Sequence, residues 1–408
     1  MRSKAAIISS LLCAAVVSLQ ADSNVYLLEV PDYSWYAGCF GTATGNLMGY
    51  WDRHGMADFY TGPTAGGVAP LDNWGANVGI RSLWASKAGF DGRPSNQPGH
   101  IDDYWVFYNN ESSYSYQSTL PDPYVTAGRA EHAPDCIGDF IGLSQRKWTS
   151  MNGECDGNID AFSFVYWDTN GNRRVNYAAT TPSGGPAPDI QSGLREWTRF
   201  KGFDADVFTQ LADFNPRTPA GRGFTFEDVK REIDAGYPLL VFLQDYNEFY
   251  RSFTNMPPRE TDMPRGNPEI HGMLVYGYEE FPEFGINYLW SRTSWASGER
   301  YYAWLAAPWE VGLSVRGVIG YRPKPKVMRI QRDGAQITIS WQGPTSQVRD
   351  AIAQTTTPVH RYVVEKASAL TGASWTTVGD ITTDLTSTFA AGAEGAAFYR
   401  VKLLGANE

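Results

Sequence analysis

The chain is poor in cysteine, in positive charge and in long apolar runs. Its 408 residues include only 4 cysteines, and 34 basic residues stand against 44 acidic ones, a formal net charge of −10. A chain with this charge balance is not expected to bind nucleic acid or an anionic membrane surface, because both attract basic proteins. No run after residue 21 is long and apolar enough to predict a membrane span, so no stable membrane anchor is expected after signal removal.

Several common catalytic motifs are also missing. There is no glycine-rich phosphate loop, no Gly-x-Ser-x-Gly elbow and no His-Glu-x-x-His zinc motif. His100 and His132 lie near carboxylates, but their spacing matches no metal-ligand template, which favours solvated turns. The stretch 168–172 resembles part of a calcium loop without its terminal Glu and is predicted to be a hairpin turn. We expect no metal and no cofactor.

The first residues have the composition of an export signal. Arg2 and Lys4 are followed by a short apolar core from Ala5 to Val17, which is too short for a membrane anchor. We assign residues 1–21 to a signal peptide. The mature chain is then expected to be secreted or periplasmic, in a compartment where disulfides persist.

The mature chain keeps three cysteines, of which two are predicted to pair. Cys136 and Cys155 enclose a loop rich in Gly, Asp and Asn. A disulfide that closes a loop of about 20 residues contributes roughly 3 kcal/mol in the chain-entropy model. This pairing leaves Cys39 alone, and a lone thiol in an exported protein points to a reactive role. The alternative is that Cys39 is a small buried hydrophobe, as free cysteines often are.

Cys39 stands where a nucleophile is favoured. An extended stretch from Val30 to Gly38 precedes it, and a helix is predicted to follow it. A thiol at a helix N-terminus feels the positive end of the helix dipole, which favours the nucleophilic thiolate. The helix has Gly41, Gly45 and Gly49 on one face, and this stripe predicts a close approach by another backbone.

The chain is too long for one ordinary hydrophobic core, so two domains are expected. Its residue pattern changes at a Pro- and Lys-rich stretch, which favours an extended linker. We predict a first domain over 24–322, a linker over 323–326 and a second domain over 327–408. In the first domain the patterns predict helices over 192–201 and 225–235, strands over 239–243, 273–278 and 286–292, and a short strand or bend over 301–304. Alternating strands in the second predict an all-β sandwich, which resembles fibronectin type III-like modules.

Three separated motifs in the first domain resemble papain-like cysteine peptidases. These are Cys-x-x-Thr-Ala from Cys39 at a helix start, His-Gly-x-x-Val-x-Gly-Tyr from His271 on a strand, and x-Ser-Trp-x-x-Gly from Thr293. The stretch 49–55 resembles the branch that includes bacteriocin-leader-processing peptidases, a cysteine peptidase family thirty-nine-like domain. The resemblance implies an α+β fold, with the papain-like domain followed by the sandwich.

The resemblance also implies a role for each matching residue. Cys39 becomes the nucleophile, His271 the general base and acid, and Thr293 the residue that orients the imidazole, with Trp295 shielding that contact. The family has Asn or Asp where this chain has Thr293. It also has a Gln before the cysteine that helps to bind the oxyanion, where this chain has Tyr33, with Ser34 and Trp35 beside it.

These residues predict an exported cysteine peptidase-like hydrolase that cleaves a peptide or amide bond of a peptide or protein substrate through a thioester at Cys39. The alternative from another class is a catalytically inactive papain-like domain that binds peptides or glycans through exposed aromatic side chains. Aromatic residues of all kinds make up 14% of the chain. The two departures from the family pattern favour this alternative. A transamidase would use the same residues with a different acceptor.

Overall fold

We describe the fold from a computed structural model. It describes residues 22–33, 38–56, 59, 68–72, 137–141, 167–178, 190–213, 219–245, 270–294, 299–303, 313–371, 374–392 and 397–405. Among these residues the helices are few and the strands pair mostly antiparallel, which is the α+β class expected from the sequence. The predicted signal peptide lies outside the described residues.

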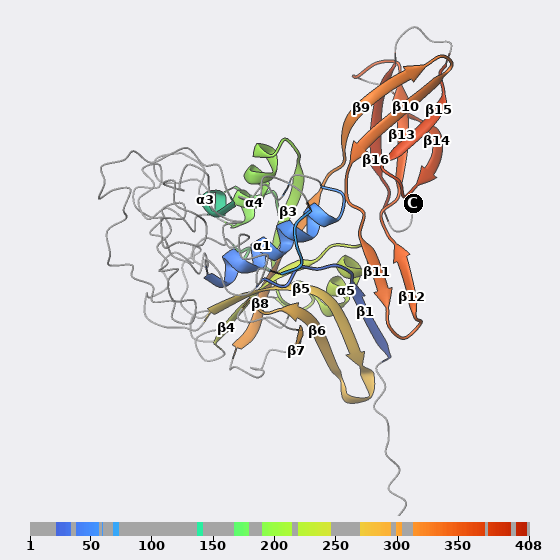
Figure 1. The fold of residues 1–408 in the computed structure, drawn as a ribbon. Coiled ribbons are helices and arrows are strands. Elements are labelled where there is room, and N and C mark those ends of the chain that lie inside the picture. The colour runs from blue at the N-terminus through green and yellow to red at the C-terminus, as the bar shows by residue number, and fades with distance from the viewer. Residues whose placement is uncertain are drawn as a thin grey trace, which may run out of the picture.

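The larger unit is built on a 10-stranded sheet (Figure 1). The strand order is β12-β11-β1-β5-β4-β8-β3-β2, and β6 and β7 extend from β5 beside this path. The bounds are β1 Ser23–Leu27, β2 Arg174–Val175, β3 Ala205–Leu211, β4 Leu239–Asp245, β5 Ile270–Phe281, β6 Ile286–Arg292, β7 Glu299–Ala303, β8 Leu313–Pro323, β11 Gln347–Asp350 and β12 Thr355–Pro358. The apolar run 239–243 in β4 is buried throughout, as expected for a central strand covered on both faces.

Local signals in the sequence predict several of these elements well. Strands β4, β5 and β6 contain the predicted runs, and β5 pairs with β6 antiparallel. Helix α5 (Phe226–Asp234) lies within the predicted range 225–235 and begins at a capping box, in which the Thr225 hydroxyl accepts from the Asp228 N–H and the Asp228 carboxylate accepts from the Thr225 N–H. Gly236, with φ +87°, follows its end. Helix α4 (Ile190–Phe200) matches its predicted range within two residues.

Helix α1 (Gly38–Arg53) is the predicted helix at Cys39. It lies across the sheet in contact with β5 and β4, and its C-terminal end points toward the second unit (Figure 1). Helix α4 packs on β3 and also contacts the short helix α3 (Ile137–Ile141). Helix α5 packs on β5 and β1. The core between these layers is one hydrophobic cluster, to which α1 contributes Phe40, Leu47 and Trp51.

The second unit is a β-sandwich of two three-stranded sheets. Their orders are β15-β10-β9 and β14-β13-β16. The bounds are β9 Lys326–Asp333, β10 Gln336–Gln342, β13 Tyr362–Ala367, β14 Thr376–Thr382, β15 Thr386–Ala390 and β16 Phe398–Leu403. The two sheets share a second hydrophobic cluster, with Ile339 and Trp341 from one sheet and Tyr362 and Val364 from the other. The alternating strands match the sequence prediction, and β9 pairs antiparallel with β10 across a turn at Gly334, whose φ is +57°.

The predicted boundary between the two units is wrong in one respect. The predicted second domain, 327–408, includes residues 347–358, but these residues form the hairpin of β11 and β12, and β11 pairs with β1 in the large sheet. Alternation along a strand predicts which side chains face a core, yet it does not predict which sheet the strand joins. The larger unit is therefore completed by residues that follow the first strands of the sandwich.

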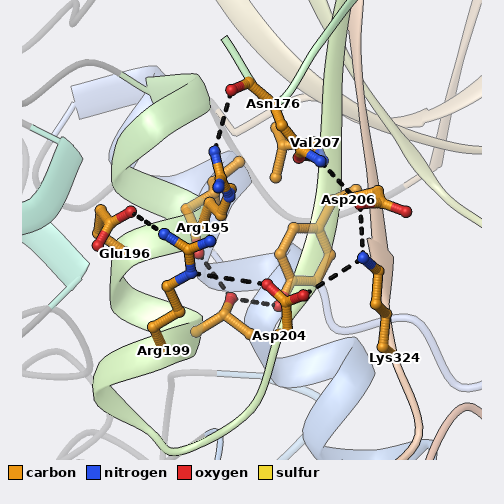
Figure 2. A network of polar contacts seen from close by, with 11 residues as sticks. Asn176, Arg195, Glu196, Arg199, Asp204, Asp206, Val207 and Lys324 are labelled. Carbon is orange, nitrogen blue, oxygen red and sulfur yellow. Dashed lines mark hydrogen bonds and ion pairs between the residues drawn. The ribbon is translucent and has the colours of Figure 1, made fainter. Parts of the chain in front are cut away.

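The predicted linker 323–326 is ordered rather than a free spacer. Pro323 ends β8 and Lys326 begins β9. Lys324 donates its backbone N–H to the carbonyl of Asp204, and its ammonium lies 2.8 Å from the Asp206 carboxylate (Figure 2). Burial acts to raise the pKa of Asp206, but hydrogen bonds from Lys324 and Asn176 outweigh it and hold that pKa below its usual value. Arg199 of α4 lies 3.6 Å from the Asp204 carboxylate, so this network joins α4, β3 and the residue after β8.

No helix of the described part of the chain is long and apolar enough to cross a bilayer.

The junction of the two units is constrained by close packing around Gly236. A Cβ atom added at Gly236 would lie 2.7 Å from Val359, 2.8 Å from His360 and 2.8 Å from Ser346. Gly236 thus supplies both a left-handed backbone and room for the chain around β11 and β12.

We expect Gly236→Ala to lower the free energy of unfolding by roughly 2–5 kcal/mol, because the left-handed backbone contributes about 1–2 kcal/mol and the overpacking about 1–3 kcal/mol. Urea denaturation measures this difference. The matched control is Gly221→Ala, since Gly221 also has a positive φ of +77° but has no atom within 4 Å of the added Cβ. Equal losses in the two variants would show that packing at the junction contributes nothing.

Candidate functional site

Cys39 is the second residue of α1, in its first turn. The first N–H groups of a helix have no partner within the helix, and they favour a negative charge nearby. The first turn of α1 contains no acidic residue that would compete for this position. The backbone placement expected for a reactive thiolate is therefore present. The side chain of Cys39 lies outside the described part.

The start of α1 packs directly on the start of β5. The ring of Phe40 lies 4.2 Å from the ring of Phe242, centre to centre, on β4. It also fills the space above Gly272, where an added Cβ would overlap the ring. Gly272 lies opposite Phe242 in the sheet, and His271 lies opposite Leu243.

This packing brings together the backbones that carry Cys39 and His271. Phe40 follows Cys39 in the chain, Gly272 follows His271, and Phe40 and Gly272 are in contact. His271 is the second residue of β5, as expected for a histidine at a strand start. Its side chain also lies outside the described part. The two residues thus belong to neighbouring chain segments, although 232 positions separate their numbers.

Thr293 follows β6 at the same end of the sheet. Arg292, the last residue of β6, lies opposite Leu274, so the chain at Thr293 continues toward the start of β5, where His271 lies. Thr293 is buried, with 6% of its surface exposed. The next residue, Ser294, is also buried and has φ +66°, a left-handed conformation that costs about 1–2 kcal/mol for a residue with a Cβ. A strained turn therefore fixes the chain beside Thr293.

Arg292 holds the segment that leads into α1. Its Nη2 donates to the carbonyl of Val30 at 3.0 Å, and its Nη1 lies 3.9 Å from the Asp32 carboxylate. The guanidinium also lies 4.7 Å from the centre of the Tyr276 ring. Sequence reasoning missed this residue. The signal was present as a lone arginine at the end of an apolar strand, directly before Thr293.

Tyr33 does not lie near Cys39 in the way that an oxyanion donor would. Its N–H donates to the side-chain oxygen of Asn46 at 2.9 Å, and its hydroxyl donates to the carbonyl of Pro70 at 2.7 Å. A Cβ added at Gly49 would lie 2.7 Å from that hydroxyl, ten residues along the helix from Cys39, or roughly 15 Å at the rise of an α-helix. We therefore do not retain Tyr33 as an oxyanion donor.

The prediction that the glycine stripe of α1 is approached by another backbone is wrong at Gly49. The close approach at Gly49 comes from the Tyr33 and Pro31 side chains, not from the backbone of another element. Ser34, Trp35 and Trp295, the other predicted residues of the cleft, lie outside the described residues. So do Cys136 and Cys155, and the disulfide between them stays a prediction.

No metal site emerges from the part of the chain that the structure describes. Within it, no three or more His, Cys, Asp or Glu residues are placed to hold a metal ion. The stretch 168–172 forms a turn, in which the Asp168 carboxylate accepts from the N–H of Asn170 at 2.7 Å and Gly171 has φ +75°. The predicted hairpin is not shown, since β2, which follows this turn, pairs with β3. The Asp168 carboxylate is thus used by its own turn.

The contact between Phe40 and Gly272 can be tested with a double-mutant cycle. We expect Gly272→Ala to lower the free energy of unfolding by roughly 1–3 kcal/mol, because the new methyl group overlaps the Phe40 ring. Phe40→Leu removes part of that ring, so the double variant should lose about 1 kcal/mol less than the sum of the single losses. Additive losses, measured by urea denaturation, would contradict the contact.

Comparison of the chain with models of protein families, with curated proteins and with solved structures finds no match. A function is therefore inferred from the chain's own residues. They offer one constellation of reactive groups on adjoining elements, at the start of α1, the start of β5 and the end of β6.

Proposed function

We propose that the protein is an exported cysteine peptidase-like hydrolase, with Cys39 as the nucleophile and His271 as the general base and acid. The observation that supports this most directly is the contact of Phe40 with Gly272, because it joins the two chain segments that carry the reactive groups. The papain-like fold and the relation to bacteriocin-leader-processing peptidases belong to the same proposal. Localisation in the periplasm or outside the cell belongs to it as well.

The proposed reaction needs only these groups and water. The Cys39 thiolate attacks the carbonyl carbon of a peptide or amide bond, and the carbonyl oxygen becomes an oxyanion near the first free N–H groups of α1. The His271 imidazolium gives its proton to the leaving amine, and the C–N bond breaks to leave a thioester. His271 then takes a proton from water, whose oxygen attacks the thioester. The acid product leaves, and Cys39 is restored.

Thr293 has the orienting role in this proposal. A threonine hydroxyl accepts a hydrogen bond from a ring N–H without carrying charge, so it stabilises an imidazolium less than Asp does. The burial of Thr293 and the fixed turn at Ser294 support a defined position for this hydroxyl. Arg292 positions the segment before α1 and is not part of the chemistry.

Thiol labelling separates the hydrolase from the inactive, peptide- or glycan-binding alternative. We expect chloroacetamide to label Cys39 at neutral pH, and His271→Ala to slow that labelling by about tenfold. The reason is that the thiol pKa returns toward about 8.5, where only a few per cent is thiolate at pH 7. Peptide mapping by mass spectrometry distinguishes Cys39 from Cys136 and Cys155.

The control for this labelling is His54→Gln, which removes a histidine at the other end of α1 and should change the rate by no more than about twofold. Labelling of the native protein at the rate of the urea-unfolded chain, with no effect of His271→Ala, would favour the binding module.

Thr293 offers a test by gain of activity. Thr293→Asn restores the residue type of the family at nearly constant volume. We expect it to raise the rate of p-nitrophenyl acetate hydrolysis roughly tenfold, or about 1.4 kcal/mol in the barrier. Thr293→Val keeps the shape without the hydroxyl and should lower the rate by a similar factor. Equal rates for the Val variant and the unchanged protein would exclude an orienting role.

A further inference from the structure

Residues 343–360, which we call the strap, leave the sandwich after β10, form β11 and β12 in the large sheet, and return to β13. The strap is bound to the C-terminal end of α1. Gly343 donates its N–H to the carbonyl of Gly55 at 3.1 Å, and Thr345 donates to the carbonyl of His54 at 3.1 Å. The far end of α1, the helix whose first turn contains Cys39, is thus held by the strap.

A buried polar chain connects the strap to the turn after α5. The Tyr50 hydroxyl donates to the Ser346 hydroxyl at 2.6 Å, which in turn donates to the carbonyl of Gly236 at 2.8 Å. Val359 closes the strap by donating its N–H to the carbonyl of Ser346 at 3.2 Å. Burial strongly raises the pKa of Tyr50, so this hydroxyl keeps its proton and remains a donor.

Two histidines are buried where the strap meets α1 and the turn at Gly236, a region that we call the joint. His54 is 5% exposed, its ring lies 4.2 Å from that of Tyr50, and its Nε2 donates to the carbonyl of Leu28 at 3.1 Å. His360 is 4% exposed and packs against Tyr237 at 5.1 Å and Trp51 at 6.3 Å between ring centres. Its Nε2 has no hydrogen-bond partner among the described residues.

The surroundings of both rings favour the neutral imidazole. Burial is the main cause that lowers the pKa of His360 to about 3, and a charge on His54 would lower it further, while the backbone of Gly236 acts in the opposite direction. Burial also lowers the pKa of His54, against the opposing effects of the Leu28 carbonyl and the Glu29 carboxylate.

The charged groups near the joint do not compensate a proton on His360. Glu29 lies near His54, but its carboxylate is bound to Arg53 at 3.0 Å. On the far side of Tyr237, the Arg322 guanidinium lies 5.4 Å from that ring and is paired with Glu232. No carboxylate of the described residues pairs with either histidine, so protonation of the closed joint leaves a buried charge uncompensated.

We propose that the strap is a pH-sensitive lock, closed while His54 and His360 are neutral and released on acidification, so that acid frees the C-terminal end of α1 from the sandwich. This inference rests on the joint alone and does not require Cys39 to be catalytic. The histidines of the open strap take up protons near pH 6.5, the ordinary histidine value, whereas those of the closed strap do so only at lower pH. Opening is therefore favoured as the pH falls below about 6.5.

The expected size of the effect follows from proton linkage. For each histidine the opening equilibrium rises by up to about tenfold per pH unit below pH 6.5. His360 maintains this dependence until the closed state itself is protonated near pH 3. The proposal thus predicts a slope of one to two protons for opening of the strap.

Hydrogen exchange of the full chain, measured by mass spectrometry between about pH 4.5 and 7.5 and corrected for intrinsic exchange, tests the lock. We expect amides of the strap to open more readily as the pH falls, while amides of β4 and β13 stay protected. The double variant His54→Gln with His360→Phe should open independently of pH, because Gln keeps a donor for the Leu28 carbonyl and Phe fills an apolar site.

A slope near zero in the unchanged protein overturns the proposal whether or not the variant folds. The same slope in the double variant, or loss of protection in β4 and β13 together with the strap, overturns it as well. The single variant His360→Phe gives a second check, because it should lower the slope by about one proton. Failure of the lock appears in exchange, whereas failure of the proposed peptidase appears in Cys39 labelling, so the two outcomes are distinguishable.

Discussion

The larger unit depends on one packing constraint, the contact of the Phe40 ring with the backbone at Gly272. Phe40 occupies the space that a side chain at Gly272 would take, and its ring packs, tilted, against that of Phe242 on the next strand. The first turn of α1 is thereby fixed against two central strands, in a core from which water is excluded. Two further contacts position the rest of α1. Tyr33 and Pro31 pack against Gly49, and the strap binds the C-terminal end of the helix.

The elements that the sequence predicts well are those with strong local signals. The capping box at Thr225 and the apolar run of β4 each depend on residues within a few positions of one another. Strand β8 was overlooked because Gly317 and Gly320 weaken its strand pattern. Its structure explains them, because added Cβ atoms would meet Trp167 at 2.7 Å and overlap the ring of Phe208.

In the candidate site, too, the features that depend on neighbouring residues are predicted, whereas contacts between residues far apart in the chain are not. The helix start at Cys39 and the strand start at His271 follow from neighbouring residues. The direction of the Tyr33 side chain does not, because spacing from a cysteine gives separation along the chain and not the face on which a ring packs. Arg292 was missed for a related reason, since its partner, the Val30 carbonyl, is 262 residues away.

The hairpin of β11 and β12 has a consequence for how this chain is inherited. Module shuffling joins genes at linkers, and residues 323–326 have the composition of such a junction. A chain divided there would leave β1 without a neighbour on one side and open a sheet edge that invites aggregation. It would also uncover Trp51 and Tyr50 at the base of the helix. A cut at this linker is therefore expected to destabilise the larger unit, so we expect the two units to be inherited together.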